Sequence, residues 1–132
     1  MAIVYMHINN INNKKYVGIT KYSDANQRWG SNGEGYKNSL FFEKGISQFG
    51  WDNFSHLILN DDLDYDSAQQ IEARLIKALH LDDIKYGYNN ASGVLIKENP
   101  NLDILCDVII KNLDNKSDNE LILSTEYRYA TN

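Results

Sequence analysis

Residues 3–20 read IVYMHINNINNKKYVGIT, two short apolar runs that each carry a tyrosine and that flank an asparagine-rich segment. Both runs are rich in β-branched and aromatic residues, which favour β-strands. Asparagine tolerates left-handed backbone and hydrogen-bonds its own main chain, so the middle segment favours a turn. The stretch therefore predicts a β-hairpin.

The hairpin is expected to bring its two phenols together. Side chains alternate along a strand, so Ile3, Tyr5 and His7 share one face of the first strand. Tyr16 and Gly18 share one face of the second. The absence of a side chain at Gly18 lets another group approach the backbone closely. Paired tyrosines on a hairpin are more often cross-strand packing than chemistry, so the rest of the chain decides between these interpretations.

Length and composition predict one intracellular domain with a small extension. A chain of 132 residues can bury a core without disulfides, and its single cysteine, Cys106, excludes an internal one. No stretch is apolar for long enough to cross a membrane, and the N-terminus lacks the pattern of a signal peptide. We therefore expect a cytoplasmic protein with no membrane partner. It would act in the host cell if a phage or another mobile element encodes it.

Charge is unevenly distributed along the chain. The net charge is -5, which argues against a protein that coats nucleic acid by charge alone. Residues 1–60 carry six basic and four acidic side chains, whereas residues 61–132 carry seven basic and fourteen acidic ones. The mildly basic half contains most of the candidate motifs. The acidic half is interpreted as a solvated face.

A short helix is expected directly after the hairpin. Ser23 or Asp24 can cap it, and it runs to about Trp29 and carries Arg28. Residues 30–35 read GSNGEG, a composition typical of a loop.

A second helix and a strand are expected next. Phe42, Ile46 and Phe49 recur at helical spacing and predict a helix over residues 39–49. Apolar residues in both registers over residues 52–59 favour a strand buried on both faces.

An acidic connector over residues 61–66 leads to a helix over residues 67–80, which Asp66 or Ser67 would cap. The connector's aspartates lack the central glycine of a calcium loop, so we interpret them as solvated. Apolar residues at helical spacing predict a further helix over residues 102–113, and Leu121–Tyr129 is expected to form a final strand or a docked tail.

Glu72 is expected at the border of the buried face of its helix, because Ala68 and Leu75 are its neighbours on the helix surface. Two histidines are weaker candidates. His56, in an apolar strand, is interpreted as a satisfied core residue, and His7 is a slightly better functional candidate because it shares a face with Tyr5.

The ordered set of motifs resembles the GIY-YIG nuclease family over roughly residues 3–93. The first motif reads Ile3-Val4-Tyr5 and the second Tyr16-Val17-Gly18. Arg28 follows on a helix, Glu72 lies on a later helix, and Asn89 lies in Gly87-Tyr88-Asn89. Two phrases are similar to a bacterial and phage branch of the family, namely Gly35-Tyr36-Lys37-Asn38 and Gln48-Phe49-Gly50-Trp51-Asp52-Asn53-Phe54.

The resemblance implies a fold and a site. The fold would be α/β, of the α+β kind: a small antiparallel sheet flanked by helices over residues 1–93, with an accessory C-terminal extension over residues 94–132. The activity would be metal-dependent hydrolysis of phosphodiester bonds, with a single Mg²⁺ or Mn²⁺ held by Glu72. Arg28 would bind phosphate oxygens through its fork of donors. Tyr5 and Tyr16 would orient water and phosphate, with the first-motif Tyr5 as a candidate general base, and Asn89 would support the site.

The substrate is expected to be DNA rather than RNA. The residues expected to contact it are Gly18, Lys15, Lys21, Tyr36 and Lys37. The acidic net charge predicts weak nonspecific affinity for DNA, so we expect either a homodimer or a separate DNA-targeting partner.

The sequence departs from the family pattern in two places. Ile3 stands where the first motif has glycine, and the loop after Arg28 lacks the histidine that many members carry as a candidate proton carrier. Tyr36 or Lys37 is a candidate replacement for that histidine. The departures also leave open a catalytically degenerate fold that binds or inhibits a partner.

Each site residue also has an ordinary structural interpretation. Arg28 can pair with Asp24 one turn earlier, Glu72 can be solvated, and Asn89 can be a turn residue.

Overall fold

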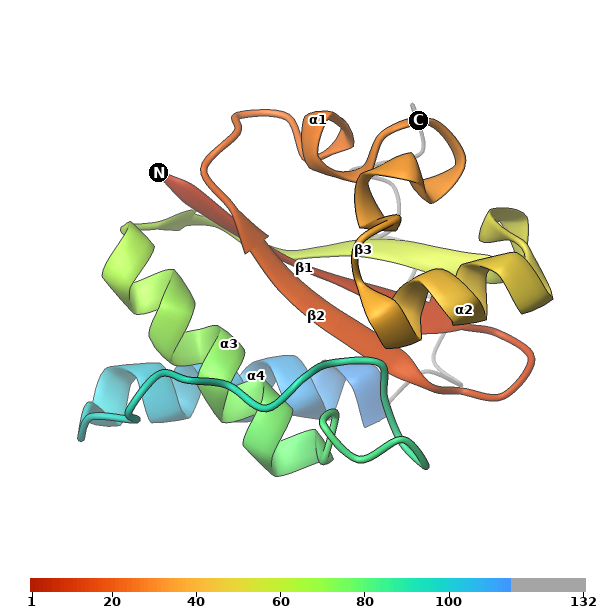
Figure 1. Cartoon of the computed structure of the whole chain (residues 1–132). Coiled ribbons are helices and arrows are strands. Elements are labelled where there is room, and N and C mark those ends of the chain that lie inside the picture. The colour runs from red at the N-terminus through yellow and green to blue at the C-terminus, as the bar shows by residue number, and fades with distance from the viewer. Residues whose placement is uncertain (115–132) are drawn as a thin grey trace.

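The central element is a three-stranded antiparallel sheet (Figure 1). The structure is a computed structural model that describes residues 1–114. Its strands are β1 (Ala2–Asn9), β2 (Lys15–Thr20) and β3 (Phe54–Leu63), in the order β2-β1-β3. The predicted hairpin is confirmed, as is the α+β fold. Tyr5 lies opposite Gly18 and His7 opposite Tyr16, so all four residues share one face of the sheet.

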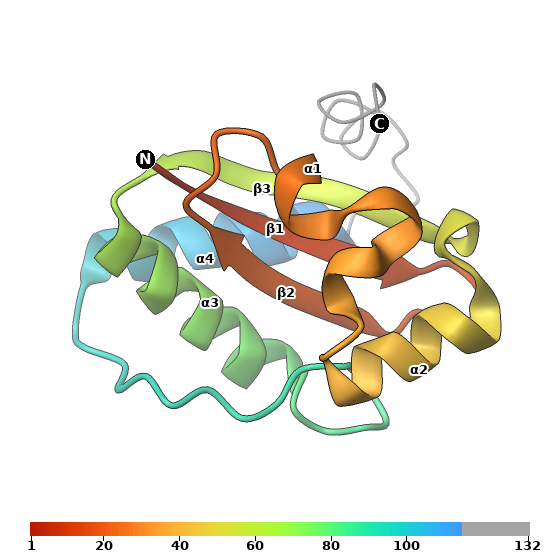
Figure 2. The ribbon, with the colours of Figure 1, turned by 45° about the horizontal axis from the view of Figure 1, so that its top comes forward.

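Helices cover both faces of this sheet (Figure 2). The short elements between β2 and β3 lie over one face. They are α1 (Asn26–Trp29), η1 (Ser31–Tyr36), α2 (Leu40–Phe49) and the 3₁₀ turn η2 (Trp51–Asn53). On the other face lie α3 (Tyr65–Leu79) and α4 (Pro100–Asp114). The helices predicted around Arg28, Glu72 and residues 39–49 and 102–113 are therefore all present.

The side chains of β1 explain this arrangement, because every residue of the strand is buried. The rings of Tyr5 and His7 contact Trp29, and His7 also contacts Tyr36 and Phe42. Alternation then places Val4, Met6 and Ile8 on the opposite face, against α3. There they join the apolar core with Ile71, Leu75 and Leu57.

The predicted strand over residues 52–59 requires correction. β3 begins at Phe54 and continues to Leu63, so it includes Asp61 and Asp62, which the sequence assigned to a connector. The strand that is buried on both faces is β1, because β3 lies at the sheet edge and is only partly buried. An edge strand tolerates exposed carboxylates, which explains why the acidic run continues the sheet.

The glycine-rich segment also differs from its prediction. Residues 31–36 form the 3₁₀ helix η1 rather than a loop. Asn32 and Gly33 adopt left-handed backbone inside it, with φ of 54° and 79°. Such residues are the ones that tolerate positive φ, so the composition that suggested a loop instead allows a tight kinked helix.

The cap of α3 is Asp64, not Asp66 or Ser67 as predicted. Asp64 has extended backbone, and its carboxylate accepts a hydrogen bond from the Ser67 backbone N–H at 2.7 Å. At α1 the prediction of Ser23 or Asp24 as the cap is wrong, because the N-cap is Ala25 without a side-chain cap. The Asp24 carboxylate nevertheless accepts a hydrogen bond from the Asn26 N–H at 2.9 Å. Both carboxylates satisfy donors in a first helical turn.

The segment after residue 93 packs on α3 as far as the structure describes it. Arg74 on α3 pairs with Asp103 on α4 (Nε–Oδ1 2.8 Å) and donates to the Lys97 carbonyl at 2.6 Å. Leu102, Cys106, Ile109 and Leu113 of α4 are buried in the same core as the sheet. The strand or tail predicted over Leu121–Tyr129 lies outside the described residues.

Within residues 1–114, no helix has the length and apolar character needed to cross a bilayer.

Candidate active site

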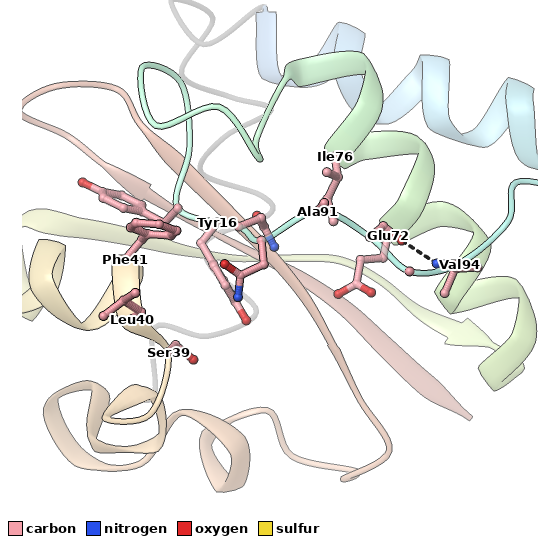
Figure 3. A pocket seen from close by; sticks show the side chains of 13 residues that line it. Tyr16, Ser39, Leu40, Phe41, Glu72, Ile76, Ala91 and Val94 are labelled. Atoms are coloured by element: carbon pink, nitrogen blue, oxygen red, sulfur yellow. Dashed lines mark hydrogen bonds between the residues drawn. The ribbon is translucent and has the colours of Figure 1, made fainter.

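A pocket of about 260 Å³ lies beside the edge strand β2, where the two helical layers approach each other. Tyr16 enters it from β2, Glu72 from α3, and Ser39–Phe41 from the start of α2. The segment Asn89–Val94 closes it. Figure 3 shows the Tyr16 ring and the Glu72 carboxylate extending into the same space from different elements. The pocket therefore joins parts of the chain that are more than fifty residues apart.

Glu72 occupies the border position that the helical spacing predicted. Its carboxyl is partly buried in the pocket wall, and this burial raises its pKa from 4.5 to about 7. The described residues contain no group of three or more His, Cys, Asp or Glu side chains placed to share a metal ion. The site is thus built around one carboxylate rather than an acidic cluster.

Arg28 comes from the last turn of α1 and lies at the centre of the tyrosines. Its guanidinium donates to the Gly35 carbonyl at 2.6 Å and lies 4.4 Å above the centre of the Tyr36 ring. The phenols of Tyr5 and Tyr16 lie close enough for its charge to act on the pKa of both. Within residues 1–114 Arg28 makes no ion pair with Asp24, whose carboxylate accepts a hydrogen bond from the Asn26 N–H instead.

The two motif tyrosines lie at different depths. Tyr16 lines the pocket, whereas Tyr5 is 1% exposed and lies beneath it. Burial raises the pKa of both phenols, while the nearby Arg28 charge opposes that rise. Electrostatic coupling of both phenols to Glu72 places the carboxylate in the same cluster.

Gly18 makes room for Tyr5. A methyl group added at Gly18 would collide with the Tyr5 hydroxyl and ring, so only glycine fits opposite this phenol. The close approach expected at this glycine is present, and the approaching group is the chain's own tyrosine. Contact between Gly18 and a substrate stays a prediction.

Asn89 is hydrogen-bonded to the backbone of β2, and its support of a catalytic site stays a prediction. Its side-chain amide accepts from the Val17 N–H at 2.9 Å and donates to the Val17 carbonyl at 2.8 Å. Lys15 exchanges backbone hydrogen bonds with Tyr86 and Tyr88 just before it. Residues 86–89 therefore cover the outer edge of β2 and hold Tyr16 in register.

Tyr36 is the predicted substrate contact that the structure places elsewhere. Its side chain is fully buried. Its hydroxyl lies 2.8 Å from His7 Nε2, and the neighbouring Tyr5 phenol raises its pKa further. Tyr36 thus lies behind the motif tyrosines and connects them to the interior.

His7 and His56 were undervalued by sequence reasoning. The two Nδ1 atoms are 2.8 Å apart, so His56 is the satisfied histidine that was expected, and its partner is the other histidine. Burial lowers the pKa of His7 well below its usual range and that of His56 to about 4. The sequence indicated only that His7 shares a strand face with Tyr5. It could not predict the contact between His7 and His56, because that contact depends on β3 lying next to β1.

The three predicted lysine contacts lie outside this buried cluster. The Lys15 ammonium donates to the Asn13 carbonyl at 3.1 Å, and the Lys21 ammonium lies 4.2 Å from the centre of the Tyr65 ring. Lys37 is exposed. Their contact with a substrate stays a prediction.

One comparison with known proteins is positive. The family model of the GIY-YIG catalytic domain matches residues 1–86. That range contains the sheet, both motif tyrosines, Arg28 and Glu72, and it ends three residues before Asn89. No curated protein and no solved structure matches the chain.

Proposed function

Because the chain belongs to the GIY-YIG nuclease family, we propose that it is a metal-dependent endonuclease that cuts or nicks DNA. The observation that supports this proposal best is that Tyr16 and Glu72 line one pocket, while Arg28 and Tyr5 lie beside Tyr16. Phosphodiester hydrolysis needs a positioned water, donors for the charged phosphate and help for the leaving oxygen. The pocket and the residues beside Tyr16 contain groups suited to these tasks.

Glu72 is the residue proposed to hold the divalent ion. GIY-YIG nucleases generally use divalent metals, and this carboxylate is partly buried with its pKa raised to about 7 by desolvation. A buried carboxylate without a neighbouring cation favours a bound ion. Mg²⁺ and Mn²⁺ accept oxygen ligands, and Mg²⁺ retains several waters, so one carboxylate and a substrate phosphate suffice. When bound, the ion would polarise the phosphate and neutralise charge on it.

Arg28 is proposed to bind the scissile phosphate. The guanidinium fork matches two phosphate oxygens, which a lysine cannot do. To reach an incoming phosphate, it would give up its hydrogen bond to the Gly35 carbonyl and move away from the two phenols. That movement would uncover the Tyr5 hydroxyl to the water that attacks phosphorus.

The two tyrosines are proposed to have different tasks because they lie at different depths. Tyr16 lines the pocket and would orient the phosphate and the water. Tyr5 would accept the proton of that water as general base. Asn89 would keep β2, and with it Tyr16, in place.

The proposal is tested by plasmid cleavage with Mg²⁺ or Mn²⁺, beside an EDTA control. Glu72→Gln keeps the shape of the side chain and removes its charge, so we expect at least a 100-fold fall in cleavage rate. Glu98→Gln, at an exposed glutamate, is the matched control and should cut like the natural chain. Supercoiled, linear and branched DNA are compared with single-stranded RNA. Absence of cleavage on every substrate would instead favour a binding or inhibitory module.

A further inference from the structure

We propose that Tyr36, His7 and His56 form a proton relay that carries the proton released at Tyr5 to solvent on the far side of the site. This inference rests on the proposed function, because it concerns the fate of the proton that the attacking water loses. It assigns a task to three residues that lie away from the pocket.

The relay is a row of neighbouring groups that can both donate and accept a proton. The Tyr5 and Tyr36 phenols are neighbours, and each shifts the pKa of the other. The Tyr36 hydroxyl lies 2.8 Å from His7 Nε2, and His7 Nδ1 lies 2.8 Å from His56 Nδ1. Tyr36 and His7 are both fully buried, so neither exchanges protons directly with water.

The far end of the chain opens into a second pocket. This pocket has a volume of about 910 Å³ and is lined by His56, Trp51, Asp52 and parts of α1 and η1. It shares no lining residue with the pocket that contains Tyr16 and Glu72. His56 therefore connects a buried hydrogen-bond chain to an open cavity that the proposed catalysis does not otherwise use.

Packing fixes the rings in the orientation that the relay needs. The His7 ring lies 4.9 Å from the Trp29 ring and 5.3 Å from the Phe42 ring, measured between ring centres. The His56 ring stacks on Trp51 at 4.0 Å. Side chains held on both sides keep their hydrogen bonds without reorganisation during the reaction.

The chemistry of a buried phenol explains why a relay is required. Burial raises the pKa of Tyr5, so the phenol carries its proton at neutral pH. A protonated phenol can accept a second proton only while it releases its own. A new positive charge on buried His7 would be costly, because burial disfavours the charged imidazole, so the proton must move on.

The step balances as a set of concerted transfers. The water oxygen bonds to phosphorus, the bond from phosphorus to the leaving oxygen breaks, and that oxygen takes a proton from bulk water. The attacking water gives one proton to Tyr5, Tyr5 gives its own to Tyr36, and Tyr36 gives its own to His7 Nε2. His7 Nδ1–H passes its proton to His56 Nδ1, and His56 Nε2–H releases one to water in the second pocket. No residue of the relay keeps a net charge.

The test is chemical rescue of His56→Ala, measured as single-turnover cleavage of a DNA that the natural chain cuts. We expect a roughly 10- to 100-fold slower rate with DNA affinity unchanged, because acid–base groups contribute effects of this order. Removing the imidazole leaves a gap that opens into the second pocket, so free imidazole should restore most of the rate. Rescue of this kind separates proton transfer from a structural role.

Two further variants complete the design. Tyr36→Phe keeps the ring beneath Arg28 and removes the hydroxyl, so it should slow cleavage similarly and resist imidazole rescue. His80→Asn, at an exposed histidine with left-handed backbone, should cut normally with or without imidazole. If His56→Ala does not fold, Tyr36→Phe decides the question alone.

Full activity in either relay variant, or folded His56→Ala that imidazole does not restore, would overturn the relay. Failure of the natural chain to cut any DNA would overturn the proposed function, and the relay with it.

Discussion

The two faces of β1 differ in chemistry although they belong to the same eight residues. Tyr5 and His7 face the aromatic elements between β2 and β3, where both ring nitrogens of His7 have hydrogen-bond partners. Val4, Met6 and Ile8 face α3 and are entirely aliphatic apart from one sulfur. A shift of one residue in strand pairing would exchange the two sets. The comparison teaches that one strand separates reactivity from stability simply by alternation.

The separation also explains why the aromatic face tolerates so many buried polar groups. A buried phenol or imidazole destabilises the fold unless it is hydrogen-bonded, and a half-satisfied network is worse than an apolar one. The aliphatic face provides the burial that offsets this cost, and the predictions below act on the two faces in turn.

The largest effect is expected from Arg28→Lys on the reactive side. Lysine keeps the charge but loses the planar fork, so single-turnover cleavage should fall about 100- to 1,000-fold, equivalent to about 3–4 kcal/mol of activation free energy. The urea midpoint should change little, because Arg28 is only partly buried and lysine keeps its charge. Lys44→Ala, at an exposed residue of α2, is the control for general loss of positive charge. A large loss of stability with unchanged cleavage would reverse the assignment of the two faces.

A smaller effect, on stability, is expected from Met6→Ala on the aliphatic face. Met6 is fully buried, so truncation should lower the free energy of unfolding by about 2–4 kcal/mol through lost burial and the cavity left behind. Cleavage per folded molecule should stay within about twofold, since the side chain points away from the site. Urea titration measures the loss of stability, and an activity assay at low temperature measures cleavage by the folded variant. Loss of activity in the fully folded variant would show that the faces are coupled.

The smallest effect is expected on the free energy of unfolding at acid pH. His56 titrates near pH 6.5 when unfolded but at about 4 in the fold, and burial lowers the pKa of His7 in the same direction. Between these values the unfolded chain binds more protons, so this contribution to stability is complete above pH 6.5 and is lost as the pH falls toward 4. Allowing for partial exposure of His56, we expect a loss of about 2 kcal/mol.

The measurement is urea unfolding at pH 7, 5.5 and 4.5. Glu72 acts in the opposite sense, because its raised pKa makes the fold bind a proton between about pH 7 and 4.5. The comparison is therefore made in the Glu72→Gln background, with and without His56→Gln. An identical pH slope in the two chains would contradict the assigned histidine pKa.

Local patterns predicted the parts of the fold that depend on neighbours in the sequence. The hairpin and the border position of Glu72 follow from strand alternation and helical spacing alone. The cap at Asp64 was missed because several acidic residues precede α3 and composition does not distinguish among them. The extent of β3 was missed because an acidic run reads as solvated, whether it forms a loop or an edge strand.

The sequence indicated which residues belong to the candidate site, but not how deeply each of them is buried. Tyr16 and Glu72 line one pocket, and Arg28 and Tyr5 lie beside Tyr16, whereas their catalytic roles stay predictions. That Tyr36 is buried, and that His7 meets His56, depends on β1 lying between β2 and β3. A sequence pattern reports which residues share a face of one strand, but it does not report which strand lies next to which.

The two hydrogen bonds between Asn89 and Val17 have a consequence for biosynthesis. They join positions 72 residues apart, so the outer edge of the strand that carries Tyr16 is paired only after the segment around Asn89 has left the ribosome. A nascent chain shorter than this has both motif tyrosines but an open strand edge and an incomplete pocket. The covalent order of the chain thus delays assembly of the pocket until the segment around Asn89 has been made.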